Sequence, residues 1–460
     1  MTQHPPDIPG NDERPPAAAP SGADSADGAW AVPHGRRQLA VVAASDFVVW
    51  AGGGAIFPYL PLFLQQEAGA SLWWIGVIAG AYFVGVFAVS PAAGRLSDRV
   101  GRKPLLVGGT LLYAVSTLLF ITTTEPALFV LFRLLEGAGV ALVVPAGQAF
   151  VAEITTDRNR SQAYGWWTTA QFGGLLIGPA LAWPLYELGG GQGLWAFYTI
   201  FLVGSALSLL AAVALALFIR EPAHAAQARQ RPATRPPLRT LLSAPILAIL
   251  LVVATAEFTM GAWEVVWSLW LVSLGHSFAF IGLTWIAFSA PMLLAFAGGR
   301  LADRHSRYVL MIAGFTAQAL MWFVFSLSDN PAVYIGAGVM GGLAFAVAFP
   351  AKQALLVQLS PPRWLGSVQG IEQMSMQGAA FIGTLTAPLI YGVIGGWIFA
   401  VCGAVGLTGV LVAAPVLRRE SACLRRAPAR SCAHLQHLTL EAEPSGVAPT
   451  GEDAVGPVID

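Results

Sequence analysis

Five acidic side chains fall inside long apolar stretches of this chain, where a charge is costly and therefore informative. They are Asp46, Glu136, Glu257, Glu264 and Glu372. Burial in a low dielectric disfavours the charged form of a carboxyl group, so such an acid is suited to take up and release a proton. We predict that Asp46 and Glu257, and after them Glu264, carry protons or bind a cation. The alternative for each is a hydrogen bond that only packs helices.

Arg133 is a basic residue within such an apolar stretch. A buried arginine is expensive in a bilayer and rarely faces lipid. Glu136 follows three residues later, lies on the same helical face and could neutralise it. We expect the pair to take part in proton coupling, with a static ion pair as the alternative. Glu372 lies near the end of its stretch and could pair with Lys352 or Arg363.

Aromatic and amide side chains accompany these acids. Trp263 and Trp267 lie near Glu264, and an aromatic and acidic lining would suit an amphipathic cation. Alternatively, the two tryptophans anchor at the membrane interface or face lipid. Three amides are further candidates for substrate binding, or for hydrogen bonds between helices: Gln171, Gln373 and Gln377.

The composition is that of a membrane protein. Of the 460 residues, 56% are hydrophobic and 11% are charged, against about 25% charged residues in ordinary soluble domains. The net charge is zero, so no nucleic-acid partner is expected. The three cysteines have no metal or disulfide spacing, and no phosphate-binding glycine loop is present. We therefore expect an all-α membrane protein that is not an enzyme and holds no metal or cofactor.

Twelve stretches are long enough to cross a bilayer, which takes roughly 20 apolar residues. They are residues 38–64, 72–93, 104–123, 127–151, 162–185, 194–218, 244–272, 279–298, 308–327, 332–356, 366–390 and 393–417. The predicted organisation is a disordered tail (1–35), a six-helix bundle (36–219), a linker (220–243), a second six-helix bundle (244–418) and a disordered tail (419–460).

Basic residues set the predicted orientation, because cytoplasmic loops carry an excess of Lys and Arg. With the N-terminus in the cytoplasm, the 94–103 and 299–307 clusters and the linker all lie inside, and the predicted outer loops contain no Lys or Arg. Both termini are therefore predicted to be cytoplasmic. The Ala- and Arg-rich, Lys-poor composition fits a multi-pass protein of a bacterial cell membrane.

The two bundles are predicted to be related by duplication. Gly94–Lys103 and Gly299–Tyr308 are near copies at an offset of 205 residues, and Pro145–Ala149 matches Pro350–Ala354 at the same offset. A charge cluster repeated between apolar stretches indicates two pseudo-symmetric halves, an architecture found mostly in secondary transporters.

With these motifs, residues 37 to 417 resemble the major facilitator superfamily. The resemblance implies that the first copy of the repeated loop is a charge-relay latch that holds the outward-open state and breaks on switching. The alternative is a set of charges that only fixes topology. The latch residues would be Gly94, Asp98, Arg99, Gly101 and Arg102, with a weaker second copy at Gly299, Asp303 and Arg304 that lacks the Gly-Arg-Lys ending.

Three further motifs carry the resemblance. Arg133 and Glu136 fall in a pattern that resembles an Arg–Gly motif of proton coupling, in which the family usually has Gln at the position of Glu136. The antiporter motif of exporters is matched by Gly165, Gly174, Gly178 and Pro179, although Ala182-Trp183 replaces its Gly-Gly ending. Pro58-Tyr59-Leu60-Pro61 resembles a motif of twelve-helix drug–proton antiporters, and we expect Tyr59 to contact substrate.

The resemblance implies a proton-driven exporter of small amphipathic compounds that works by alternating access. It would act as a monomer, with the proton gradient as its energy source. Two alternatives remain open: a proton symporter for a sugar, organic acid or other metabolite, and a membrane sensor that does not transport.

Overall fold

The computed structural model describes residues 30–156, 159–221, 242–360 and 365–426. Within these ranges the chain is helical, and the β pairing there is a single bridge between Trp30 and Thr155. Each predicted span overlaps a helix or two consecutive helices. The all-α prediction is therefore confirmed for the described residues.

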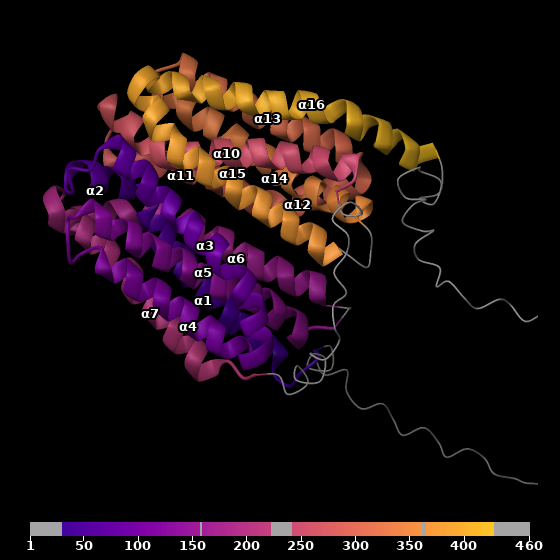
Figure 1. Cartoon of the computed structure of the whole chain (residues 1–460), viewed down its shortest axis with the longest axis horizontal. Coiled ribbons are helices and arrows are strands. Elements are labelled where there is room, and N and C mark those ends of the chain that lie inside the picture. Colours follow the sequence, from indigo (N-terminus) through magenta and orange to yellow (C-terminus); the bar gives the residue numbers. More distant parts are fainter. Residues whose placement is uncertain (1–29, 157–158, 222–241, 361–364, 427–460) are drawn as a thin grey trace, which may run out of the picture.

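The helices form two bundles that lie side by side (Figure 1). The N-terminal half contains α1 (Gly35–Ile56), α2 (Leu60–Gln66), α3 (Leu72–Val100), α4 (Arg102–Leu119), α5 (Pro126–Ile154), α6 (Arg160–Leu188) and α7 (Gly193–Phe218). The C-terminal half contains α10 (Ala244–Ser273), α11 (Phe278–Ser289), η1 (Ala290–Leu294), α12 (Ala295–Arg304), α13 (Arg307–Leu327), α14 (Pro331–Leu359), α15 (Leu365–Ile394), η3 (Gly395–Trp397) and α16 (Ile398–Arg426).

Prolines explain two of the breaks between helices. Pro58 lies between α1 and α2, and Pro291 lies in η1, which separates α11 from α12. Proline lacks the N–H that would continue the helical hydrogen bonds, and its ring clashes with the preceding turn. Two of the predicted spans are thus interrupted rather than continuous α-helices.

By length and composition, nine segments within the described residues could cross a membrane. One of them, Ser367–Arg419, contains most of both α15 and α16, whereas α4 and α6 are not among the nine. α4 begins with Arg102-Lys103, and α6 carries many Gly, Trp and polar residues. These residues lower the hydropathy of helices that are otherwise long enough.

The two halves contact each other at one end of the molecule and separate at the other. At the closed end, where α2 and the starts of α3 and α11 lie, one continuous hydrophobic core includes residues of both halves. There a Cβ added at Gly76 of α3 would lie 2.7 Å from the carbonyl oxygen of Leu385 of α15. At the opposite, open end each half has a hydrophobic core of its own, and the bundles diverge in Figure 1.

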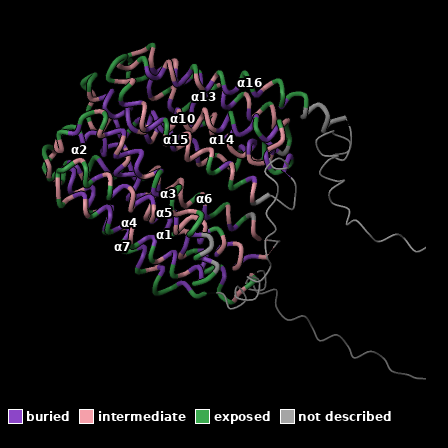
Figure 2. Tube along the Cα trace, in the orientation of Figure 1, coloured by how far each residue is buried: buried purple, intermediate pink, exposed green. Residues whose placement is uncertain are grey.

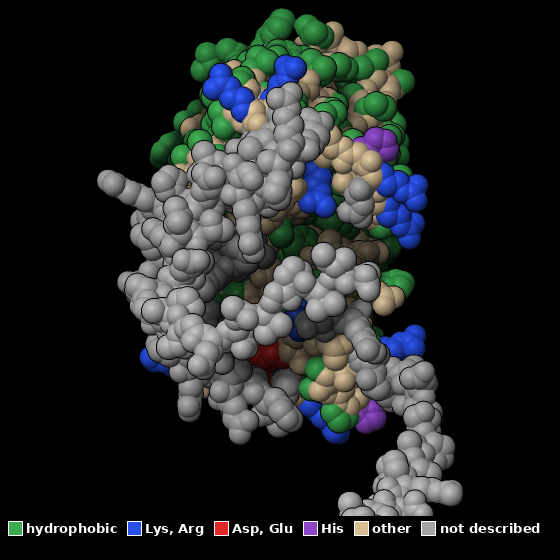
Figure 3. Space-filling model, turned by 90° about the vertical axis from the view of Figure 1, so that its right-hand side faces the viewer, with side chains coloured by type: hydrophobic (Ala, Val, Ile, Leu, Met, Phe, Trp, Pro, Cys, Tyr) green, Lys and Arg blue, Asp and Glu red, His purple; other side chains and the backbone are tan. Residues whose placement is uncertain are grey.

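The open end is the end at which α1 and α10 begin. Figure 3 views the molecule from this end and shows a recess between the two halves, with Lys and Arg side chains around it. Figure 2 shows buried residues concentrated inside each bundle and where the bundles meet, with exposed residues on their outer surfaces. The recess is therefore accessible from the open end of the molecule.

Two predicted boundaries need correction. Residues 30–34, assigned from sequence to a disordered tail, pack on the end of α5: Ala31 N–H donates to the Ile154 carbonyl at 3.2 Å, and Trp30 lies against Gly35. Trp30 and Val32 are apolar and join the core of the open end. α16 also continues to Arg426, beyond the predicted boundary at 418. The remaining parts of both predicted tails lie outside the described residues.

Candidate functional site

A cavity inside the N-terminal half contains Asp46. Its empty volume is about 580 Å³, including space open to solvent, and it is lined by residues of α1, α3, α4, α5 and α6. Asp46 is buried, and its Oδ2 accepts hydrogen bonds from Trp167 Nε1 and, at 2.9 Å, from Gln171 Nε2. Trp50, Tyr82 and other apolar or aromatic side chains form most of the remaining wall. The cavity therefore combines one carboxylate with aromatic faces.

Helix packing explains why Asp46 meets these two donors. Trp167, Gln171, Gly174 and Gly178 lie on one face of α6, at spacings of three and four residues. A Cβ added at Gly174 would lie 2.4 Å from the carbonyl oxygen of Phe47, and one at Gly178 would lie 2.5 Å from the carbonyl carbon of Gly54. The two glycines therefore let α6 approach α1 closely enough for hydrogen bonds to Asp46.

Arg133 and Glu136 form a buried ion pair beside this cavity. Arg133 Nη1 donates to Glu136 Oε2 at 2.8 Å, and Thr117 Oγ1 donates to Glu136 Oε1 at 2.7 Å. The Arg133 guanidinium also lies over the Tyr82 ring, 4.7 Å from its centroid. Glu264, on α10 of the other half, is close enough for its charge to act on Arg133. Tyr82, which lines the cavity, therefore connects it to the charged pair.

The C-terminal half contains a second charged cluster. Lys352 of α14 and Glu372 of α15 form a buried ion pair. Lys352 Nζ also lies 4.3 Å from the centroid of the Phe349 ring. Lys352 and Glu257 line a common narrow void, whose empty volume of about 270 Å³ includes space open to solvent, together with Gln318, Met260 and three phenylalanines. The pairing of Glu372 with Lys352, one of the two options left by the sequence, is present.

Three residues predicted to bind substrate lie at the closed end instead. Trp263 and Trp267 are buried in an aromatic cluster with residues such as Trp285, and Trp267 Nε1 donates to Thr284 Oγ1 at 2.8 Å. Tyr59 is buried, stacks on Phe278 of the other half and donates to its carbonyl oxygen at 2.9 Å. In this conformation, all three close one end of the molecule rather than line either cavity.

The two remaining predicted amides are not part of these cavities. Gln373 is exposed and Gln377 is half-buried, both on α15. They follow Glu372 on the same helix, but neither lines the cavity around Glu257. Among the amides predicted to bind substrate, Gln171 alone lines one of the two cavities described above.

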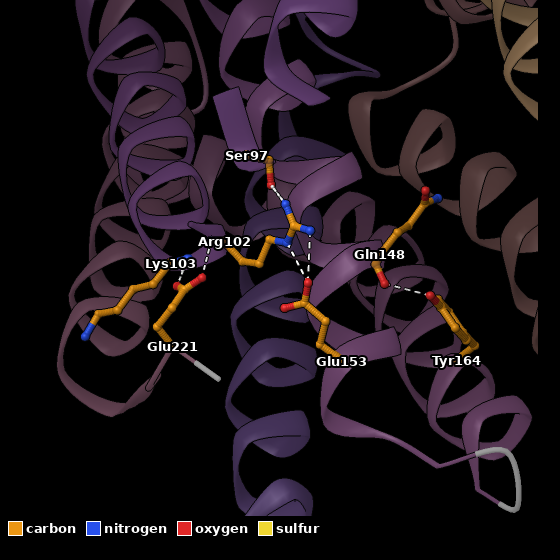
Figure 4. A network of polar contacts seen from close by, with 7 residues as sticks. All are labelled: Ser97, Arg102, Lys103, Gln148, Glu153, Tyr164 and Glu221. Carbon is orange, nitrogen blue, oxygen red and sulfur yellow. Dashed lines mark hydrogen bonds and ion pairs between the residues drawn. The ribbon is translucent and has the colours of Figure 1, made fainter. Parts of the chain in front are cut away.

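The repeated loop between α3 and α4 forms a polar network at the open end (Figure 4). Arg102 donates to Glu153 of α5 through Nε at 3.0 Å and Nη2 at 2.9 Å, and to Ser97 Oγ through Nη1 at 2.8 Å. Glu221 accepts from the backbone N–H groups of Arg102 at 2.7 Å and Lys103 at 2.9 Å. Glu221 thus satisfies two backbone donors at the first turn of α4, where a negative charge is also favourable.

Gly101 has the backbone conformation that this turn requires. Its φ of 103° lies in a region that residues with a Cβ rarely adopt, and an added Cβ would collide with the Glu221 carboxylate. Arg99 is exposed and lines a groove beside the last turns of α3. The side chain of Asp98 lies outside the described residues, as do the surroundings of Gly94.

The second copy of the loop repeats one contact of the first. Arg307 Nη1 donates to Gln358 Oε1 at 3.2 Å, and these two positions correspond to Arg102 and Glu153 at the offset of 205 residues. A neutral amide replaces the carboxylate, so the contact is a hydrogen bond and not an ion pair. Gly299 and Arg304 lie on α12 with Arg304 exposed, and the side chain of Asp303 lies outside the described residues.

Sequence comparison identifies the family. The profile of the Major Facilitator Superfamily matches residues 42–290 and 265–440, which is most of the chain. The chain belongs to the major facilitator superfamily. Its curated relatives include multidrug resistance protein 2 of Bacillus subtilis (strain 168), at 33% identity over 186 residues, which cover 39% of this chain and 43% of that protein.

Two other bacterial proteins are similar to parts of the chain. Multidrug resistance protein 1 of Bacillus subtilis (strain 168) is 29% identical over 243 residues, covering 53% of this chain and 59% of that protein. Quinolone resistance protein NorA of Staphylococcus aureus is 23% identical over 186 residues, covering 40% of this chain and 46% of that protein. The matched part of the chain thus spans about half the length of these relatives.

Solved structures of other transporters share the fold. A bacterial homologue of the human lysosomal transporter Spinster, in an inward-facing and occupied conformation, superimposes with a TM-score of 0.65 at 15% identity, covering 85% of this chain and 96% of that one. A D-xylose–proton symporter superimposes with a TM-score of 0.66 at 17% identity, covering 82% and 96%. These likenesses show that the chain shares the fold of these transporters.

Within this superfamily fold, sequence reasoning missed several residues of the site. Trp167 holds Asp46, Tyr82 and Tyr113 line the N-terminal cavity, and Glu153 binds Arg102. A signal existed for Trp167, which lies one helical turn before Gln171. A second signal was the offset of 205 residues between Glu153 and Gln358, which extends the match of the two halves. For Tyr82 and Tyr113, the sequence contains no comparable signal.

Proposed function

We propose that this protein is a proton-driven exporter of small amphipathic compounds, above all of those that carry a positive charge. Membership of the superfamily and similarity to multidrug resistance proteins support export. The observation that carries the proposal is the N-terminal cavity, in which the buried Asp46 is the carboxylate among aromatic side chains.

Such a cavity can exchange a proton for a cation. A carboxylate in a desolvated site binds either a proton or a positively charged group, and each neutralises the charge and excludes the other. The faces of Trp50, Tyr82 and Tyr113 offer further attraction to a cation and apolar area for the rest of the compound. Protonation of Asp46 from outside would then release the compound, and loss of that proton to the cytoplasm would restore the site.

Alternating access would expose this site to each side of the membrane in turn. We propose that twelve membrane passes form the two bundles, with both termini and the linker in the cytoplasm. The Lys and Arg side chains around the open end support this orientation because positive charges favour the cytoplasmic side. The open recess would then face the cytoplasm, and the core shared by both halves would seal the outside.

Asp46→Asn tests this function in proteoliposomes. An imposed pH gradient should drive transport of the fluorescent cation ethidium by the original protein. The variant should lose at least about 90% of that transport, because an amide cannot exchange a proton for a cation. Asp329→Asn removes an acid at the exposed end of the loop between α13 and α14 and serves as the matched control. Equal pH-driven transport by Asp46→Asn and the control would refute the proposal.

A further inference from the structure

A groove runs along the N-terminal half where α3 and α5 diverge towards the open end. Its empty volume is about 610 Å³, including space open to solvent. It shares no lining residue with the cavity that contains Asp46, so the two are separate. The groove is lined by one charged and five apolar side chains, namely Val89, Ala92, Ala93, Leu96 and Arg99 of α3 and Leu142 of α5.

The groove faces away from the other half and out of the bundle. On a helix with 3.6 residues per turn, Leu96 points roughly 160° away from Gly76, the position at which α3 meets α15. Leu96 and Arg99 are both exposed. Leu142 lies on the same face of α5 as Leu131, which is 49% exposed. In a membrane, apolar side chains on such an outer face are in contact with lipid.

The corresponding place in the C-terminal half is closed by a backbone contact. At the offset of 205 residues, Ala93 corresponds to Gly298. A Cβ added at Gly298 would lie 2.0 Å from the carbonyl oxygen of Ala346, so α12 and α14 touch there without room for a methyl group. The methyl group of Ala93 is accommodated, so α3 and α5 must lie farther apart at the matching point. The repeated fold therefore does not require the groove.

The length of the groove matches one leaflet of a bilayer. Val89 and Arg99 are separated by ten positions in the sequence, which is roughly 15 Å along a helix. Half of the hydrocarbon core of a bilayer is also roughly 15 Å thick. The apolar part of the groove can therefore accompany one acyl chain from the middle of the bilayer to its surface, where the long side chain of Arg99 reaches the headgroups.

The end of the groove is positively charged. The loop Gly94–Lys103 has four basic residues and one acidic residue, and Glu153 and Glu221 bring two further negative charges to it. Four positive charges thus face three negative ones. Among the residues that the structure describes, Arg99 has no hydrogen-bond or ion-pair partner. Basic pockets between membrane helices bind the headgroups of anionic lipids.

We propose that this groove binds one anionic phospholipid, with an acyl chain along Val89, Ala92 and Leu96 and the phosphate group on the guanidinium of Arg99. The inference goes beyond the proposed export and does not depend on it. A phospholipid without net charge has a cationic group in its own headgroup, which Arg99 repels. Such a lipid should therefore bind less tightly.

Two phospholipids with the same acyl chains test the proposal. Palmitoyl-oleoyl phosphatidylglycerol carries one negative charge, and palmitoyl-oleoyl phosphatidylcholine has no net charge. Native mass spectrometry of the purified full-length protein in detergent counts the bound lipids and gives their dissociation constants. The original protein should bind one phosphatidylglycerol about fivefold more tightly than phosphatidylcholine, since one arginine near an anionic headgroup is worth about that factor.

Four variants at exposed positions make the comparison specific. Arg99→Gln should remove the preference of about fivefold and leave the binding of phosphatidylcholine unchanged. Arg304→Gln is the matched control, because Arg304 occupies the same position in the second copy of the loop, and it should keep the preference. Ala92→Phe fills the groove with a ring and should weaken the binding of both lipids by the same factor. Ala297→Phe, at the offset of 205 residues, is its control and should weaken neither.

Each outcome decides the inference. Loss of the preference in Arg99→Gln but not in Arg304→Gln, together with weaker binding of both lipids in Ala92→Phe, would support the site. Equal losses in Arg99→Gln and Arg304→Gln would mean that phosphatidylglycerol follows the general positive charge of the open end, which overturns the inference. It is also overturned if the original protein has no preference, or if Ala92→Phe binds both lipids as before.

The two arginine variants decide the matter even if Ala92→Phe does not fold. None of these measurements involves transport. The exporter proposal is therefore tested separately, by Asp46→Asn, and either proposal can fail without the other.

Discussion

Arg102 is bound to Glu153 through two of its guanidinium nitrogens, at 3.0 Å and 2.9 Å. The contact joins the loop between α3 and α4 to the end of α5, and the same carboxylate lies next to Ile154, which accepts a backbone hydrogen bond from Ala31. The N-terminal segment, the repeated loop and α5 are therefore fastened together at the open end. The corresponding contact between Arg307 and Gln358 has no ionic component.

The difference between the ionic contact of Arg102 and the neutral contact of Arg307 is tested by substituting their acceptors, Glu153 and Gln358. Glu153→Gln should lower the free energy of unfolding by about 1–2 kcal/mol, because a charge-assisted hydrogen bond becomes a neutral one. The Glu153 side chain is 22% exposed, so solvent screening keeps the effect modest. Gln358→Glu is the reciprocal change and should stabilise slightly or not at all, because that contact is exposed. Thermal unfolding in detergent measures the stability of both variants. An equal loss of stability in the two would contradict a difference between the ionic and the neutral contact.

Removal of the Tyr59 hydroxyl should loosen the closed end. Tyr59→Phe keeps the ring stacked on Phe278 but loses the hydrogen bond to its carbonyl oxygen, which is worth about 0.5–1.5 kcal/mol. The population in which the closed end has opened should rise accordingly. Spin labels at two exposed positions on the two halves, Trp73 and Trp397, would report it as a longer distance. Tyr186→Phe, whose ring also stacks on Phe278, is the control and should leave the distance distribution unchanged.

Stability should fall by different amounts when Arg133 and Glu136, the two members of the buried ion pair, are replaced. Arg133→Ala leaves the Glu136 carboxylate buried without its cation and should cost about 3–5 kcal/mol of stability. Glu136→Gln should cost clearly less, because an amide oxygen can still accept from Arg133 or Thr117. Unfolding of both variants in detergent provides the measurement. A larger loss of stability for Glu136→Gln than for Arg133→Ala would show that the ion pair does not determine stability at this site.

The glycines of α6 should differ sharply in their tolerance of a methyl group. In Gly178→Ala the new Cβ would lie 2.5 Å from the backbone of Gly54, so α1 and α6 would have to separate, at a cost of about 1–3 kcal/mol. Gly165→Ala is the matched control in the same motif, because an added Cβ there meets nothing within 4 Å. Transport should fall in the first variant and persist in the second. Equal transport by the two would exclude close packing as the role of Gly178.

Much of this protein could be read from its amino-acid sequence. The length of the apolar stretches predicts the helices, and the offset of 205 residues predicts two related halves. Both are properties of the linear amino-acid sequence. The pairing of Glu136 with Arg133 is equally local, because residues three apart on a helix are neighbours. These predictions need no knowledge of how the helices pack.

The sites were decided by the tertiary structure. Asp46 and Trp167 are 121 residues apart, and Glu257 meets Lys352 from a different helix. In a soluble helix, alternation of polar and apolar residues would show which face turns inward. In a membrane, lipid is as apolar as the protein core, so residues facing outward and residues facing inward look alike. That is why the sequence shows which acids lie within apolar stretches but leaves open which way Trp263 and Trp267 face, whereas helix packing buries both tryptophans at the closed end.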